Sequence, residues 1–159
     1  MPPQRAYLLN ALLNAGAVPG RAVPGYMADR VGVFNTMCIT ACTCAAFIFG
    51  LWYTAGQHEG LITAFAVVFG FWSGAAIGLT PVCVAQVCRV EDIGKRTGTA
   101  FFVASFGVLT GVPIAAAVLE QGRQEYGGLI VFGGAFYFAA FVAFCVARGI
   151  AGGWNWRKF

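Results

Sequence analysis

The sequence predicts an all-α integral membrane protein with about five transmembrane helices, and three observations support this. Of the 159 residues, 59% are hydrophobic and only 10% are charged, whereas soluble domains carry about 25% charged residues. Residues 31–58, 60–88, 97–119 and 126–147 contain no Asp, Glu, Lys or Arg, and each stretch exceeds the ~20 residues that cross a bilayer as a helix. None of them shows the alternation of a barrel strand.

The charge-free stretches place the membrane spans in order along the chain. A first, interrupted stretch precedes them and contains Arg21. We expect spans near 7–27, 35–55, 61–85, 97–118 and 128–148, followed by a short tail, 149–159.

This composition excludes an ordinary soluble enzyme and a nucleic-acid-binding module, because a soluble domain must keep a polar exterior. We expect no cofactor and no metal site, since the single histidine, His58, lies in a predicted loop. The six cysteines lie mostly inside apolar spans, where they act as small packing residues. No catalytic residue is predicted, because no span offers a Ser/Lys or Cys/His arrangement.

Lysine and arginine gather on one side of the predicted spans. Seven of the ten share that side, namely Arg30, Arg89, Lys95, Arg96, Arg148, Arg157 and Lys158. Because cytoplasmic loops are enriched in these residues, we expect the connection near Arg30, the connection 86–96 and the C-terminus to be cytoplasmic.

Arg21 is the main candidate binding residue, because it lies inside the first predicted span. An unpaired guanidinium in a bilayer costs about 2.5–3.5 kcal/mol on insertion scales, so such a residue usually faces a wet cavity or a partner. Asn10 and Asn14 share one helix face and can line the same cavity. The alternatives are that Arg21 extends to the cytoplasmic surface or pairs with Asp29, and that the asparagines bind a neighbouring helix.

Glycines recur at helix-packing intervals in two later spans. Gly70, Gly74 and Gly78 are four residues apart, as are Gly107 and Gly111. This spacing places each set on one helix face, where a neighbouring backbone can approach closely. A tight contact within a bundle explains the pattern, and so does helix tilting in a transporter.

The segment from Gly25 to Gly32, with Asp29 and Arg30 between, resembles the signature loop of the major facilitator superfamily, G-x-x-x-D-R/K-x-G-R/K. Val33 stands where that motif usually has a basic residue. In this family the loop lies on the cytoplasmic face, where its aspartate belongs to a gating charge network. The resemblance therefore implies a cytoplasmic gating loop at Gly25, Asp29, Arg30 and Gly32.

The resemblance extends over nearly the whole chain. The segment 14–35 is similar to the eighth span and following loop of fungal monocarboxylate-transporter-like proteins. Segments 69–74, 79–81, 94–98 and 109–114 resemble their tenth and eleventh spans. Residues 1–148 therefore correspond to a partial C-terminal half of such a transporter, spans eight to twelve of twelve.

In that family the arginine that matches Arg21 engages the substrate carboxylate. Ala17 stands where animal members have an aspartate linked to proton coupling. The resemblance thus implies a secondary transporter for small organic anions such as monocarboxylates, working by alternating access in the plasma membrane, with a proton as candidate coupling ion. The substrate site of this fold lies between two halves, so we expect a missing N-terminal half to be required for transport.

A second interpretation remains open at this point. A five-span membrane protein without transport activity, acting as a regulatory or assembly partner, would show the same composition and charge distribution.

Overall fold

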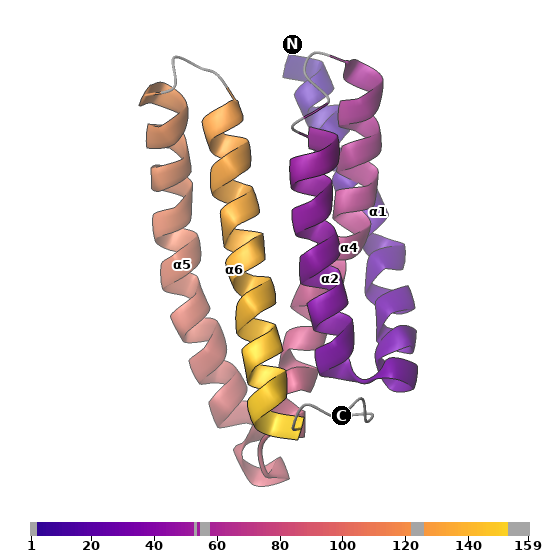
Figure 1. Ribbon diagram of the computed structural model, residues 1–159, viewed down its shortest axis with the longest axis vertical. Coiled ribbons are helices and arrows are strands. Elements are labelled where there is room, and N and C mark those ends of the chain that lie inside the picture. The colour runs from indigo at the N-terminus through magenta and orange to yellow at the C-terminus, as the bar shows by residue number, and fades with distance from the viewer. Residues whose placement is uncertain (1–2, 53, 55–57, 122–125, 153–159) are drawn as a thin grey trace.

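The computed structural model describes residues 3–52, 54, 58–121 and 126–152, and every regular element within them is a helix. The five long helices are α1 (Pro3–Val31), α2 (Val33–Phe47), α4 (Glu59–Gln86), α5 (Ile93–Gln121) and α6 (Gly127–Gly152). The π-helical turn η1 (Ile48–Trp52) continues α2, and the short 3₁₀ helix η2 (Val90–Asp92) precedes α5. The long helices run side by side (Figure 1), so the all-α fold class is confirmed.

Four segments of the described chain are long and apolar enough to cross a membrane: 33–52, 59–86, 90–121 and 127–150. The first helix, α1, has the necessary length, with 29 residues. It is not apolar enough to be counted with these four segments, because asparagine, arginine, proline and glycine interrupt its apolar residues. The chain is therefore an integral membrane bundle in which one long helix, α1, is less apolar than the others.

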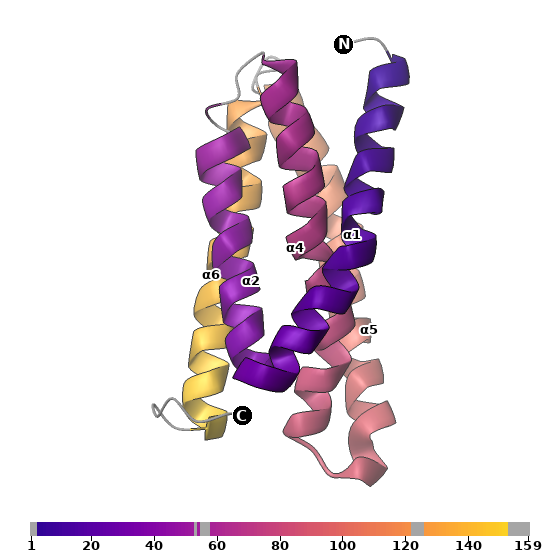
Figure 2. The same cartoon turned by 90° about the vertical axis from the view of Figure 1, so that its right-hand side faces the viewer.

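The helices form two layers, most easily seen in Figure 2, where α2, α4 and α1 lie in front of α6 and α5. The helix α1 packs mainly against α4, and α2 packs against both α6 and α4. Near its middle α1 changes direction (Figure 2). Pro19 and Pro24 lie in this part of the helix, and proline bends a helix because it removes a backbone donor and crowds the preceding turn.

A single residue, Gly32, connects α1 to α2. Its φ of 101° lies in the region that favours glycine. The Gly32 backbone N–H donates to the Ala28 carbonyl at 2.9 Å, and the Gly32 carbonyl accepts from the Thr36 backbone N–H at 3.0 Å and from Thr36 Oγ1 at 2.9 Å. The two helices are thus joined by a tight, fully hydrogen-bonded turn, much shorter than a connection over 28–34.

Two buried clusters hold α1, α2, α4 and α6 together. One surrounds the α1–α2 turn and includes Phe34, Met37 and Leu79. The other, toward the opposite end, contains Ile48, Phe65 and Ile130. There the rings of Trp52, Phe65, Phe69 and Tyr137 form a chain with successive centroids 5.1, 5.2 and 5.5 Å apart.

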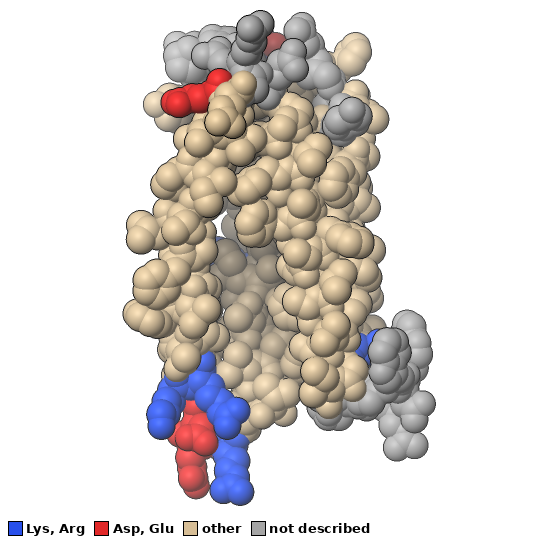
Figure 3. Space-filling view, turned by 60° about the vertical axis from the view of Figure 1, so that its left-hand side comes forward, with Lys and Arg blue, Asp and Glu red and all other residues tan. Residues whose placement is uncertain are grey.

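The helix α5 differs from the others, because none of its residues is buried. It contacts α4 and α6 over short stretches, and its phenylalanine, valine and leucine side chains are exposed along much of its length. The space-filling view shows a largely uncharged flank with charged side chains mainly at its two ends (Figure 3). This distribution is typical of a protein surrounded by lipid.

Candidate functional site

The polar side chains of α1 gather on one face of the helix. At 100° per residue, Asn10, Asn14 and Arg21 fall within about 40° of one another and extend over about 16 Å of the helix axis. The Asn14 side-chain amide donates to the Asn10 carbonyl at 2.8 Å and to Asn10 Oδ1 at 3.3 Å. All three residues are exposed, so they form one polar stripe that the other described helices leave uncovered.

Arg21 is the cation of this stripe. It lies ten residues before the end of α1 at Val31, about 15 Å from that end at 1.5 Å per residue. Within the described residues its guanidinium has no hydrogen bond and no ion pair, and Asp29 is likewise unpaired and exposed. The structure therefore does not bring Arg21 and Asp29 together, and the guanidinium is available to a ligand.

Another face of α1 packs closely on α4 through glycine. A methyl group built on Gly16 would lie 2.5 Å from the Val67 carbonyl oxygen, and one on Gly74 would lie 2.9 Å from the Ala17 carbonyl oxygen. Methyl groups on Gly20 and Gly70 would overlap the backbone of the facing helix. These four glycines fix the position of α1, and hence of its polar stripe, on α4. Gly16 and Gly20 are not among the predicted packing glycines, although they are four residues apart, as the predicted packing glycines are.

The remaining glycines of the predicted packing set have open surroundings. Methyl groups on Gly78, Gly107 and Gly111 would meet no described atom within 4 Å beyond their own helix backbone. Their Cβ positions thus point away from every described neighbouring helix, so a packing role for them remains a proposal about surfaces that this bundle leaves uncovered.

The gating motif lies mostly inside α1. Gly25, Asp29 and Arg30 belong to the last two turns of the helix, and only Gly32 lies in the turn. The Arg30 guanidinium donates to the Tyr26 hydroxyl at 2.5 Å and lies 5.1 Å from the centre of the Tyr26 ring. The structure thus pairs Arg30 with Tyr26 and leaves the Asp29 carboxylate free of hydrogen bonds with other described residues.

An ion pair joins the other ends of α1 and α4, where Arg5 donates to the Glu59 carboxylate. Both side chains are about half exposed. Such exposed pairs contribute at most about 1 kcal/mol to stability. Among the described residues, Arg5 is therefore the one arginine of α1 that forms an ion pair with a carboxylate.

The predicted tail, 149–159, lies only partly within the described residues. Residues 149–152 continue α6, so the helix ends later than the predicted span. Arg157 and Lys158, which enter the orientation prediction, lie outside the described residues.

The fold and the polar stripe define a class of protein, namely a bundle of membrane-crossing helices with one polar helix. The chain is 34% identical to the riboflavin transporter MCH5 of Saccharomyces cerevisiae over 155 residues. These aligned residues cover 97% of this chain and 30% of that protein. It is 37% identical to the MFS-type transporter hasB of Aspergillus fumigatus over 147 residues, and this alignment covers 90% of this chain and 33% of that protein.

A further relative is the MFS-type transporter opdF of Penicillium oxalicum, 36% identical over 155 residues, or 98% of this chain and 36% of that protein. The chain spans about a third of the length of these curated relatives. No family model matches the chain, and no solved structure matches it. The chain is therefore homologous to a segment of fungal major facilitator superfamily transporters, and the predicted resemblance is confirmed.

Proposed function

We propose that this chain works as part of a secondary transporter for small organic anions, such as monocarboxylates, that operates by alternating access. The observation that carries the proposal is Arg21, an exposed cation well inside α1 that pairs with none of the described residues. In lipid such a group costs several kcal/mol, so it favours a water-filled cavity or a ligand of opposite charge.

The stripe has the chemistry to bind a carboxylate. A guanidinium binds a carboxylate through two parallel hydrogen bonds. Asn10 and Asn14 each carry an amide that can donate to further oxygen atoms of the substrate. Attraction between Arg21 and the anion is stronger in a partly desolvated cavity than in bulk water, because the local dielectric constant is lower.

The proposal includes a further part of the transporter that covers the stripe. The relatives are about three times as long as this chain, and in this fold the substrate lies between two halves. The polar stripe of α1 and the unburied helix α5 are the surfaces that an N-terminal half would cover. Transport then requires that half, because α1 alone presents its polar residues to lipid.

The gating role is assigned to the segment around the α1–α2 turn. Gly32 alone joins the two helices, and both its backbone N–H and its carbonyl are hydrogen-bonded, so we expect a tilt of one helix to move the other. Gly25 has open space around it, and Asp29 is free to pair with a neighbouring helix in one of the two transport states. Arg30, held by Tyr26, is the nearby cation whose contacts change with that movement.

Orientation and location complete the proposal. The described ends near Arg30, Arg89, Lys95, Arg96 and Arg148 lie on one side of the bundle, which supports a cytoplasmic C-terminus. The resemblance favours the plasma membrane. A proton remains the candidate coupling ion, but its coupling cannot run through position 17, where Ala17 replaces the aspartate of animal members. Because the relatives are named as transporters, neither the non-transporting alternative nor an enzyme is favoured.

The test uses a chimera in which this chain replaces the matching segment of the yeast riboflavin transporter. Uptake of labelled monocarboxylates and of riboflavin is measured in cells, and surface expression is measured in parallel. Arg21→Gln should abolish carboxylate uptake at unchanged surface expression, and Arg21→Lys should keep part of it. The matched control, Arg5→Gln, removes a charge from the same helix, about 24 Å away, and should keep uptake.

Carboxylate uptake by the Arg21→Gln chimera at the level of the unmutated chimera would overturn the role of Arg21. Uptake of riboflavin, which has no carboxylate, without uptake of any carboxylate would overturn the proposed substrate class.

A further inference from the structure

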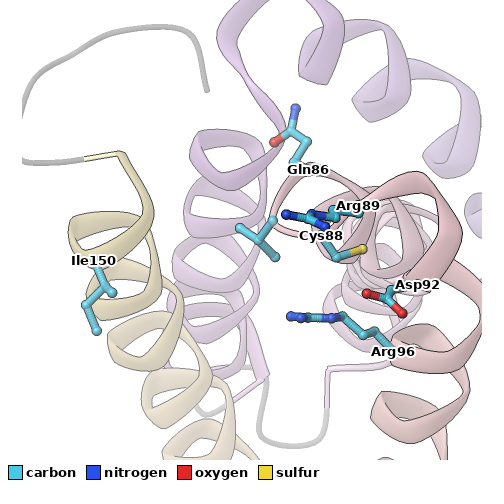
Figure 4. A pocket seen from close by; sticks show the side chains of 7 residues that line it. Gln86, Cys88, Arg89, Asp92, Arg96 and Ile150 are labelled. Atoms are coloured by element: carbon cyan, nitrogen blue, oxygen red, sulfur yellow. The ribbon is translucent and has the colours of Figure 1, made fainter.

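A second polar region lies away from the α1 stripe, where α4 passes into α5. A cavity of about 780 Å³ opens there, lined by side chains of the connection, among them Arg89, Asp92 and Arg96, and by Ile150 of α6 (Figure 4). It lies at the end of the bundle, where a membrane surface would be. The transport proposal makes no use of it.

Two arginines give this cavity its charge. Figure 4 shows Arg89 and Arg96 pointing the same way, toward the side on which Ile150 lies. Neither guanidinium has an ion pair within 4.0 Å in the described chain, even though Asp92 lines the same cavity. The cavity thus presents two cations and one carboxylate, and its cations are unsatisfied.

An apolar cavity of about 460 Å³ adjoins the charged one. Val87 and Ile150 line both. From there the apolar walls continue along α4 to Thr80 and along α6 to Phe144. Val87 and Thr80 are seven positions apart, which corresponds to about 10 Å along the helix axis, directed into the bilayer. Charged and apolar spaces therefore meet at one point, with the charged space at the membrane surface.

We propose that these joined cavities bind an acidic phospholipid, with its phosphate at Arg89 and Arg96 and an acyl chain along α4 and α6. Arginine matches phosphate oxygens through paired hydrogen bonds, and basic pockets between helices on the cytoplasmic side of a membrane bind acidic headgroups. A free phosphate would leave the apolar cavity empty, whereas a phospholipid fills both. The site is independent of the transport proposal.

The test measures phosphatidylserine binding to the purified full chain by native mass spectrometry, with phosphatidylcholine as the neutral comparison. Glycerophosphoserine, the same headgroup without acyl chains, reports binding of the headgroup alone. We expect phosphatidylserine to bind more tightly than both. A basic residue that contacts an acidic headgroup contributes about fivefold in affinity, so Arg89→Gln with Arg96→Gln should weaken binding by about 30-fold.

Two matched controls separate the site from a general surface charge. Lys95 neighbours Arg96 but lines neither cavity, so Lys95→Gln removes one charge nearby and should leave affinity nearly unchanged. Val87→Trp fills the junction of the two cavities and should weaken binding of phosphatidylserine but not of glycerophosphoserine. Its control, Val90→Trp, changes an exposed valine that lines neither cavity and should bind as the unmutated chain does.

Three results would overturn the proposal. Equal affinity for phosphatidylserine and phosphatidylcholine would show that the site does not select acidic lipids. A loss with Lys95→Gln as large as with the double arginine variant would show that only the overall charge matters. Equal binding of glycerophosphoserine and phosphatidylserine would show that the apolar cavity holds no chain. Circular dichroism of each variant verifies that its helices are intact.

Discussion

A methyl group on Gly20 of α1 would overlap the carbonyl group of Phe71 in α4. The two helices therefore meet backbone to backbone at this point, as glycine-rich interfaces in membranes allow. The contact lies next to Arg21 in the sequence, so it also fixes the position of the Arg21 backbone along the bundle.

We predict that Gly20→Ala destabilises the bundle while a matched glycine substitution in α5 does not. The new methyl group has only backbone to displace, and overpacking of this kind costs about 1–3 kcal/mol. Gly107→Ala is the control, because a methyl group there meets no described atom within 4 Å. Thermal unfolding in detergent, followed by circular dichroism, measures both. Equal stability of the two variants would contradict the close α1–α4 contact.

The α1–α2 turn leads to a second prediction. Gly32 has a φ of 101°, and a side chain in such a conformation costs about 1–3 kcal/mol. Gly32→Ala should therefore lower the midpoint of thermal unfolding, and Gly98→Ala, in the open helix α5, should not. Unfolding of both variants at the temperature of the unmutated chain would contradict the positive φ at Gly32.

Water access along α1 gives a third prediction. In the chimera described above, made free of other cysteines, Asn14→Cys should react with a thiol reagent that dissolves only in water. Val23→Cys should react slowly, because residue 23 lies on the opposite side of the helix and an exposed position there faces lipid. Labelling rates are read by mass spectrometry. Faster labelling at residue 23 than at residue 14 would show that the aqueous cavity lies on the face of α1 opposite Asn14, which contradicts the proposal.

Orientation can be tested with a cysteine that the chain already has. Cys88 lines the charged cavity between α4 and α5, and we predict that this side is cytoplasmic. In a variant that keeps only Cys88, an impermeant maleimide added to intact cells should fail to label it. Permeabilised cells should be labelled, because the reactive thiolate needs contact with water. Labelling in intact cells would invert the orientation.

The helices could be predicted from the sequence because charge-free stretches of this length rarely form any structure other than a membrane-spanning helix. The membrane dictates that every backbone group be satisfied internally, so apolar stretches such as 60–88 become single helices. Their ends were harder to place, since α1 runs on to Val31 and α6 to Gly152. Gly32 alone makes the turn at the end of α1, because glycine can adopt a positive φ.

The sites could be predicted only where they depend on one helix. The stripe of Asn10, Asn14 and Arg21 follows from helical periodicity alone. The cavity at Arg89 and Arg96 requires Ile150 of α6 beside the α4–α5 connection, a contact between distant parts of the chain that periodicity does not reveal. For the same reason, spacing alone does not separate Gly70 and Gly74, where a methyl group would meet α1, from Gly78, where it would meet no other described helix.

The central claim is that this chain acts as a segment of a longer transporter. An immunoblot of native membranes, with an antibody against residues 154–159, tests it most directly. We predict a band at about three times the 16.8 kDa of the chain, in line with the lengths of its relatives. A single band at 16.8 kDa would contradict the account and favour a membrane protein without transport activity.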